Sequence, residues 1–434
     1  MQVKLIISGV FYLLCFTSSN LIAQTTKESN SKNNLVIEGT VYDQSTRKPL
    51  EYASVALANN QIGTITNVQG KFRLLVPEKY KESFIKISFI GYKTVNYKIT
   101  NQKSFWLPED PRMLAEVTFQ GLKTATILKK ALKKIPDNYY QKPYTTEGFY
   151  RATSRKNNKD YISIGEGAFR VYQTQPARKN QVLLKKLRST NHELYEGFTP
   201  LLATTTLLNL DVVNRSKRVR ILDKKGLKNH VFQVKKVVPY EDTEVYVITF
   251  NQKDSFKGVG YKGEFWIDKH TFAFVYLDFA FSPKGIGYYK EKLEKYERYM
   301  LDELGITTKL LKYRRQHYYK KMGGRYYLHR ASIIQTKQID RLGMYNIKDD
   351  YRVDYLVTAY YPEQTKPFPK DEVIKSKKWQ RNPYSFYESA KPGFWNAYNI
   401  LLPEVSYADV AKRLKAANEA LKQKEKETKQ GKEK

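Results

Sequence analysis

The feature that most constrains the fold is a series of short segments in which apolar and polar residues alternate, separated by turn-forming residues. In SFIKISFI (83–90), for example, Ile85, Ile87 and Phe89 would share one face. A period of two residues is typical of a β-strand that is half buried on a sheet. About seven such segments follow one another over residues 35–107 without a helix-period segment, which predicts a small seven-stranded β-sandwich.

The segment GTITNVQGKF (63–72) has the residues of a strand, a turn and a second strand. Asn67 to Gly70 would turn the chain, and Phe72 would point inward at the start of the next strand. A phosphate-binding loop needs Ser or Thr after its lysine, where this chain has Phe72, and a calcium loop needs several carboxylates, which the segment lacks. The sequence therefore predicts a structural hairpin. The structural residues of this motif, together with a second turn further on, are Gly63, Thr64, Thr66, Asn67, Gly70, Phe72, Gly91 and Tyr92.

Three motifs in order, VIEGTVYDQSTRKPLEYASVAL, GTITNVQGKFRL and IKISFIGYKT, resemble the carboxypeptidase-regulatory-like domain that is common at the N-termini of exported Bacteroidetes proteins. The matching residues are Gly39, Val41, Asp43, Pro49, Leu50, Ala53, Val55, Gly63, Thr64, Thr66, Gly70, Phe72, Gly91 and Tyr92. The resemblance implies a prealbumin-like sandwich that serves as a non-catalytic accessory module.

Residues 1–24 have the pattern of a signal peptide. Lys4 precedes the apolar run LIISGVFYLLCF, and Ala23 is a small residue at which a signal peptidase could cut. The only cysteine, Cys15, could be acylated in a lipoprotein, but Leu14 before it is larger than the small residue usual at that position. We expect an exported protein, periplasmic or associated with the outer membrane, whose mature chain has no disulfide.

The formal net charge of +33 is a large excess of Lys and Arg over Asp and Glu. The excess is concentrated in three segments, 178–188, 215–228 and 312–330. Such a surface attracts polyanions, which for an exported protein are anionic lipid, lipopolysaccharide and acidic glycan rather than nucleic acid. Lysine-rich strands can also be ordinary solvated faces. The predicted polyanion-binding residues are Lys312, Arg314, Arg315, Lys320, Lys321, Arg325 and Arg330.

The sequence contains no motif for hydrolysis or zinc binding. None of the five histidines is followed three residues later by the glutamate of the zinc carboxypeptidase pattern, and neither H-E-x-x-H nor G-x-S-x-G occurs. We therefore predict a non-catalytic protein without cofactor or metal, which binds an apolar or anionic ligand or docks on an outer-membrane protein. Two alternatives stay open, an outer-membrane β-barrel and a hydrolase with a dispersed site. The residues of such a site would be His192, Glu196, Asp268, His270 and Asp278.

The rest of the chain is again rich in strand patterns. After a linker at 108–120, TATILKKALKKIP reads as a helix that Pro136 ends, and eight long candidate strands follow. The hairpin GEFWIDKHTFAFVYLDFAF (263–281) resembles that of periplasmic lipoprotein-carrier half-barrels, in which a curved sheet holds lipid. The predicted fold is mainly β: the sandwich, then a larger antiparallel, curved sheet with a few helices over 121–403, and a charged helix and tail over 404–434.

Overall fold

The computed structural model describes residues 34–58, 62–111, 123–174, 180–195, 210–214, 220–241, 243–291, 295–374 and 393–432. The predicted signal peptide with Cys15, most of the predicted linker and Glu196 lie outside these ranges. The described residues belong to one compact unit, Asn34–Lys434.

The first seven strands form two small sheets that pack face to face. One sheet has the order β4-β1-β7 and the other the order β3-β2-β5-β6. Both contribute to one apolar core, with Val41 and Phe72 from the first sheet and Val55 and Ile87 from the second. The strands are β1 (Asn34–Asp43), β2 (Ser54–Leu57), β3 (Gly63–Ile65), β4 (Lys71–Pro77), β5 (Phe84–Ser88), β6 (Val95–Lys98) and β7 (Ser104–Leu107). The predicted sandwich is confirmed.

The turn at 67–70 is real, but the predicted hairpin is wrong. β3 pairs with β2 and β4 pairs with β1, so this turn crosses from one sheet to the other. Asn67 stabilises the crossing, because its side-chain oxygen accepts hydrogen bonds from the N–H groups of Gln69 (2.9 Å) and Lys71 (3.0 Å). Gly70 has φ +71°, which favours glycine, and Phe72 is buried as predicted.

The other predicted structural residues also lie in the sandwich, where they have packing roles. The Thr66 hydroxyl donates to the Leu50 carbonyl (2.6 Å) and accepts from the Ala53 N–H (2.8 Å). Gly63 and Thr64 form the buried strand β3. Gly91 has φ +86°, and the Tyr92 hydroxyl donates to Asp43 (2.7 Å).

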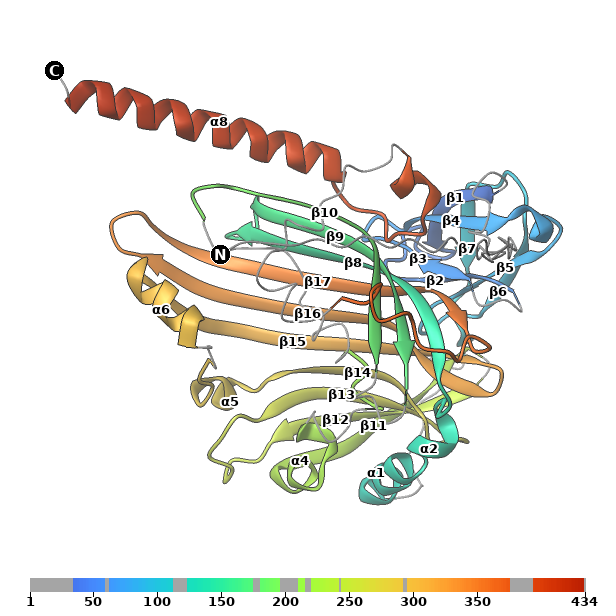
Figure 1. The fold of residues 1–434 in the computed structure, drawn as a ribbon. Coiled ribbons are helices and arrows are strands. Elements are labelled where there is room, and N and C mark those ends of the chain that lie inside the picture. The colour runs from blue at the N-terminus through green and yellow to red at the C-terminus, as the bar shows by residue number, and fades with distance from the viewer. Residues whose placement is uncertain are drawn as a thin grey trace, which may run out of the picture. The chain divides into compact units, whose positions relative to one another are not determined.

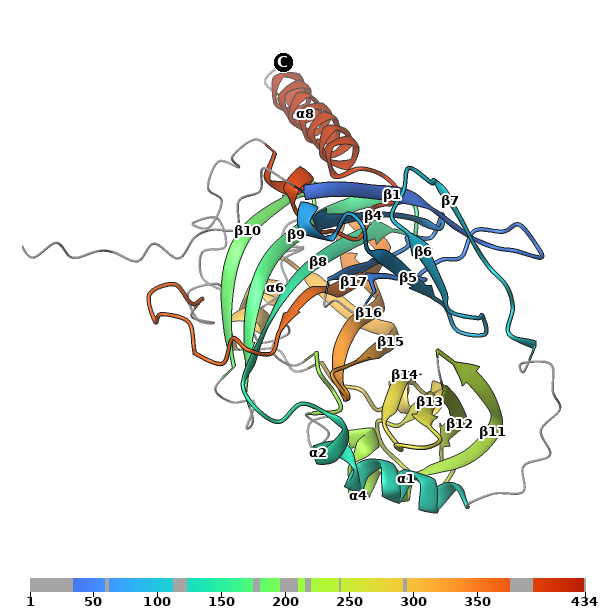
Figure 2. The ribbon, with the colours of Figure 1, turned by 90° about the vertical axis from the view of Figure 1, so that its right-hand side faces the viewer.

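The second part is a single antiparallel sheet of ten strands, with the order β10-β9-β8-β17-β16-β15-β14-β13-β12-β11. Two meanders, β8–β10 and β11–β17, meet where β8 pairs with β17. The sheet is curved and open, with β10 and β11 at its two ends (Figure 2). The strands are β8 (Tyr144–Lys156), β9 (Asp160–Gln173), β10 (Gln181–Asn191), β11 (His230–Tyr240), β12 (Thr243–Gln252), β13 (Tyr261–Asp268), β14 (Phe274–Phe281), β15 (Ile306–Met322), β16 (Arg325–Arg341) and β17 (Tyr345–Tyr361).

Short helices lie around the sheet, and Figure 1 shows the long α8 near β9 and β10 and α6 beside the ends of β15–β17. The α-helices are α1 (Thr124–Lys133), α2 (Ile135–Asn138), α4 (Lys224–Asn229), α5 (Pro283–Gly287), α6 (Lys295–Glu303) and α8 (Tyr407–Lys432). The described residues also include the short 3₁₀ helices η2 (Glu78–Tyr80), η5 (Arg220–Leu222) and η7 (Phe394–Ala397). No helix in the described part of the chain has the length and apolarity needed to cross a bilayer.

The mainly β fold with a larger antiparallel sheet is confirmed, and the eight candidate strands after residue 121 are all present. The sequence analysis did not predict β8, which begins shortly after α2, or β10, which lies in a basic segment. The predicted helix over TATILKKALKKIP is α1, with Ile127, Leu128 and Ala131 buried against the sheet. It ends at Lys133, and Pro136 lies in the first turn of α2.

Candidate ligand-binding groove

One face of the large sheet carries a row of polar residues that crosses all ten strands. The residues lie opposite one another in register, because each strand contributes one member. In strand order they are Arg188, Glu166, Arg151, Asp354, Ser332, Gln316, Asp278, Glu264, Thr249 and Gln233. We call this set the polar row.

The neighbouring row, one residue along each strand, points to the opposite face, because successive side chains of a strand alternate. It consists of Leu187, Gly167, Tyr150, Tyr355, Ala331, His317, Leu277, Phe265, Ile248 and Val234. These residues are apolar or aromatic except His317. The two faces of the sheet therefore differ: one packs the main apolar core with α1, and the other presents the polar row.

At the β8–β10 end, Glu166 is fully buried between two arginines. Its carboxylate oxygens lie 2.6 Å from the Arg151 guanidinium and 2.5 Å from that of Arg188. The Arg188 guanidinium is itself held between two aromatic rings, 4.4 Å from the Trp395 centroid and 4.2 Å from that of Tyr407. The buried charge is thus compensated on both sides, as a buried carboxylate requires.

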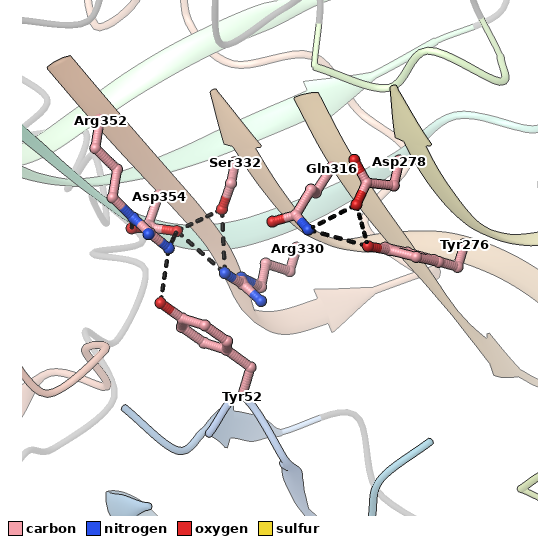
Figure 3. A network of polar contacts seen from close by, with 8 residues as sticks. All are labelled: Tyr52, Tyr276, Asp278, Gln316, Arg330, Ser332, Arg352 and Asp354. Atoms are coloured by element: carbon pink, nitrogen blue, oxygen red, sulfur yellow. Dashed lines mark hydrogen bonds and ion pairs between the residues drawn. The ribbon is translucent and has the colours of Figure 1, made fainter. Parts of the chain in front are cut away.

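In the middle of the row, Asp354 accepts from both Arg352 (2.6 Å) and Arg330 (3.3 Å) and from the Ser332 hydroxyl (Figure 3). Burial alone would raise the pKa of Asp354, but the charge of Arg352 and these hydrogen bonds outweigh it, so the pKa of this carboxyl lies below its usual value. Tyr52, from the loop before β2, covers this cluster. Its ring lies 3.7 Å from the Arg330 guanidinium, and its hydroxyl accepts from Arg352 (2.7 Å).

A third cluster centres on Asp278, whose carboxylate accepts from Gln316 (3.1 Å) and from the Tyr276 hydroxyl (2.9 Å) (Figure 3). It also accepts from the Arg314 guanidinium, which the figure does not draw. In all three clusters the carboxylate oxygens are occupied by donors. A carboxylate held in this way is a poor general base or nucleophile, since its charged form is stabilised by its partners. The polar row therefore supplies fixed charges rather than reactive groups.

Beside the polar row, on the same face, lies an open groove of about 890 Å³. Its lining is mostly polar and comes from β8, β15, β16 and β17, the turn between β8 and β9, and the segment before α8. The lining residues that bear on binding are Arg155, Lys312, Lys348, Arg352, Asp350 and Glu404. We call this feature the basic groove.

The four cations of the basic groove differ in how they are held. Arg352 is fixed by Asp354, and Arg155 lies 3.7 Å from Glu404 and 4.5 Å from the Tyr161 ring centroid. Lys312 and Lys348 are exposed, and no acidic side chain among the described residues lies within ion-pair distance of either. These two ammonium groups can therefore pair with a ligand without first breaking an ion pair.

The structure distributes the seven predicted polyanion-binding residues over several places. Lys312 lines the basic groove, and Arg314 lies beside it on the same face, paired with Asp278. Arg315 is on the opposite face of β15, and Arg330 is buried against Asp354. Lys321 lies over the Tyr326 ring, and Arg325 donates to the Pro136 carbonyl (3.3 Å).

Lys320 lies apart from the others, in a small cavity of about 50 Å³ that Tyr52 and Ser88 also line. Burial lowers its pKa, while Glu241 partly offsets that effect. Of the seven, then, Lys312 lines the basic groove with Arg314 beside it, and Lys321 lines the separate cavity that also contains Asp268 and His270.

The residues of the alternative, dispersed hydrolase site do not come together where they are described. His192 lines a cavity next to α8, whereas Asp268 and His270 line a different cavity beside the turn between β15 and β16. Asp268 is a turn residue, since it accepts from the N–H groups of His270 (2.9 Å) and Thr271 (2.7 Å). Asp278 belongs to the polar row. The described residues hold no group of three or more His, Cys, Asp or Glu side chains placed to bind a metal.

Sequence reasoning missed most of the charged members of the polar row, including Glu166 and Asp354. A signal was present for Glu166, which is the one acid in the largely apolar segment YISIGEGAFRVY. Buried acids of this kind need cationic partners. The partners of Glu166 could not be identified, because Arg151 and Arg188 lie on the neighbouring strands β8 and β10.

Comparison with known families shows that residues 37–119 match the CarboxypepD_reg-like domain. The match supports the predicted carboxypeptidase-regulatory-like domain; it covers the sandwich, extends past β7 to residue 119, and does not reach the large sheet. No curated protein matches the chain.

Three solved structures show distant similarity. An outer membrane lipoprotein-sorting protein domain from Vibrio parahaemolyticus is 9% identical, with 58% of this chain and 97% of the other covered and a TM-score of 0.25. A DUF1329 family protein from Desulfovibrio piger is 8% identical, with 58% and 98% covered and a TM-score of 0.25. A membrane-associated protein of unknown function from Bacteroides fragilis is 11% identical, with 76% and 99% covered and a TM-score of 0.14. At such TM-scores the function has to be argued from the chain itself.

Proposed function

We propose that this chain is a non-catalytic, exported protein of the cell envelope that binds an anionic ligand in the basic groove. The observation that carries the proposal is the pair of exposed, unbridged lysines, Lys312 and Lys348, on adjoining parts of one open groove whose other cations are fixed by partners. Export rests on the pattern of residues 1–24.

The chemistry of the groove suits sulfate, phosphate or carboxylate groups on an extended ligand. Ammonium groups act as point charges toward such anions, and Arg155 and Arg352 offer planar donors beside them. The acids Asp350 and Glu404 on the groove wall would limit binding to ligands whose charges fall near the lysines. Two sources carry these groups in a cell envelope: acidic glycan and anionic lipid headgroups.

Binding of a labelled heparin hexasaccharide and of soluble short-chain phosphatidylglycerol, each followed by fluorescence anisotropy or calorimetry, tests the proposal. The double variant Lys312→Glu, Lys348→Glu should weaken binding about tenfold, corresponding to about 1.4 kcal/mol. Because a charge change anywhere weakens attraction to a polyanion, the matched control is Lys235→Glu, Lys236→Glu, two exposed lysines of β11 with the same change in net charge.

We expect the control to change the dissociation constant by less than about twofold, since it alters only long-range attraction that salt screens. Binding of one probe alone would identify the source of the anionic group. Equal weakening by both double variants, or binding of neither probe by the wild type, would rule the basic groove out as the site.

A further inference from the structure

The turn that joins β16 to β17 presents apolar side chains to solvent. Leu342 is 87% exposed and Met344 is 52% exposed, and both flank Gly343, whose φ of +72° forms the turn. Turns are usually made of Gly, Asn, Asp, Ser or Pro, because these residues suit the backbone and the solvent. Leucine and methionine have neither advantage here, so their exposure at the tip calls for a contact that covers them.

The hairpin tip is supported by packing at its base and by a backbone hydrogen bond. At its base, Ile339, Tyr345 and Ile347 pack in an apolar cluster that also includes Leu301 and Leu304, at the end of α6. The Leu342 N–H donates to the carbonyl of Gly305, just after α6 (3.4 Å). Figure 1 shows α6 beside this hairpin at one end of the sheet. The apolar tip is therefore held out from the sheet by structured neighbours.

Further features of this end of the sheet suit a membrane surface. Tyr299 on α6 is 57% exposed, and tyrosine is a residue that favours the boundary between headgroups and acyl chains. Arg341 adjoins Leu342. The exposed Lys348 lies on the same hairpin, and the exposed Lys309 lies on the neighbouring strand β15.

Acidic residues are present at this end as well. Asp340 accepts a hydrogen bond from the Asn346 amide, and Asp302 and Glu303 are exposed at the end of α6.

We propose that this tip, Leu342 and Met344, inserts into the interfacial region of a bilayer that carries anionic lipids, with the neighbouring cations on the headgroups. Interfacial binding needs only a small apolar area combined with attraction to anionic lipid. A second copy of the chain fits less well, because a stable protein interface buries about 1,200 Å² or more, and a two-residue convex tip offers far less. The inference goes beyond the basic groove, since it concerns attachment to a surface and needs no soluble ligand.

Co-sedimentation of the full chain with vesicles of phosphatidylethanolamine and phosphatidylglycerol tests the inference, with phosphatidylcholine vesicles as the neutral comparison. The variant Leu342→Ser, Met344→Ser should lower the bound fraction on the anionic vesicles about fivefold or more, since apolar burial at the interface is lost. The matched control is Val36→Ser, Val231→Ser, which removes two other exposed apolar side chains (45% and 58% exposed). All four positions are at the surface, so both variants should fold, as circular dichroism can verify.

A second measurement tests directly whether the tip enters the bilayer. In the full chain with Cys15→Ser, which removes the only cysteine, Leu342→Cys is labelled with a polarity-sensitive fluorophore and Val231→Cys serves as the control. Fluorescence of the Leu342 label should rise and shift to the blue on anionic vesicles, and that of the Val231 label should not.

An unchanged bound fraction for the tip variant, or equal loss in tip and control variants, would overturn the inference. So would a dimer, seen by sedimentation velocity, that only the tip substitutions dissociate, since that result would make a second copy the occupant. The tip variant should keep its affinity for the heparin hexasaccharide. This measurement therefore distinguishes a failure of the membrane-insertion proposal from a failure of the proposed anion binding in the basic groove.

Discussion

Two buried aspartates five residues apart on β17 have opposite electrostatic surroundings. Asp354 lies on the polar face, where Arg352 and Arg330 stabilise its charge. Asp349 lies on the other face, where burial raises its pKa to about 6, while a hydrogen bond from the Ser154 hydroxyl and the charge of Lys337 only partly offset this. Strand alternation alone separates the two environments.

The pKa of Asp349 predicts a pH-dependent effect of Asp349→Asn. Between about pH 4 and pH 6 the folded protein keeps a proton that the unfolded chain has released, so the free energy of unfolding falls as the pH rises through this window and is level above it. An asparagine has no such proton and can still accept from Ser154. We expect the variant to be more stable than wild type by up to about 3 kcal/mol at pH 7.5 and equal to it near pH 4.

Urea denaturation at pH 4.5 and pH 7.5 measures the effect. Asp160→Asn, at an exposed position at the start of β9, is the control and should show no gain at either pH. A gain of equal size at both pH values would mean that packing rather than the proton explains the stabilisation.

At the scale of elements, the polar row depends on which strands pair and in which register. The sequence could predict features formed by adjacent residues, but not those that depend on strand pairing. The sandwich turn at Asn67–Gly70 was predictable, because its geometry depends on adjacent residues. That this turn crosses between sheets was not, since strand patterning does not say which strands pair. For the same reason the sequence could not predict that Arg151 lies opposite Asp354. The two residues are on β8 and β17, which are the first and last strands of the large sheet along the chain. Of the predicted polyanion residues, Lys312 is exposed in the basic groove without an ion pair to a described residue, whereas Arg314 and Arg330 are paired with acids on other strands that the sequence could not identify.

Removing the negative charge from the polar row should be costly. Glu166→Gln leaves Arg151 and Arg188 (side chains 11% and 27% exposed) without their carboxylate, and breaking a buried ion pair costs about 3–5 kcal/mol. Chemical denaturation of wild type and variant gives the difference. The control is Glu244→Gln, in the half-exposed pair with Lys269, where about 0–1 kcal/mol is expected. Similar losses in the two variants would contradict a special role for the row.

At the scale of the whole molecule, packing and polar contacts join the sandwich to the sheet. Ile65 packs with Phe149 and Leu356, and Tyr52 covers the arginines of the central cluster. Tyr52 has φ +60°, a strained value for a non-glycine residue, so its position is imposed by the surrounding contacts.

Two substitutions of Tyr52 should therefore lower the free energy of unfolding, the second more than the first. Tyr52→Phe loses the hydrogen bond from Arg352, at about 1 kcal/mol, and keeps the ring over Arg330. Tyr52→Leu also loses the cation–π contact, for a total of about 2 kcal/mol. Differential scanning calorimetry should show a lower transition for both. A broadened or split thermal transition is expected for Tyr52→Leu only. A transition unchanged from wild type in Tyr52→Leu would contradict the role of Tyr52 in coupling the sandwich to the sheet.

The pairing of β8 with β17 has a consequence for biosynthesis. The ribosome delivers β8–β10 long before β17, and at ordinary translation rates the interval is on the order of ten seconds or more. During that time the free edge of β8, which includes Arg151, has no native partner and could pair with the edge of another chain. Yield of this protein should thus depend on holding factors that protect the first meander until the last strand emerges.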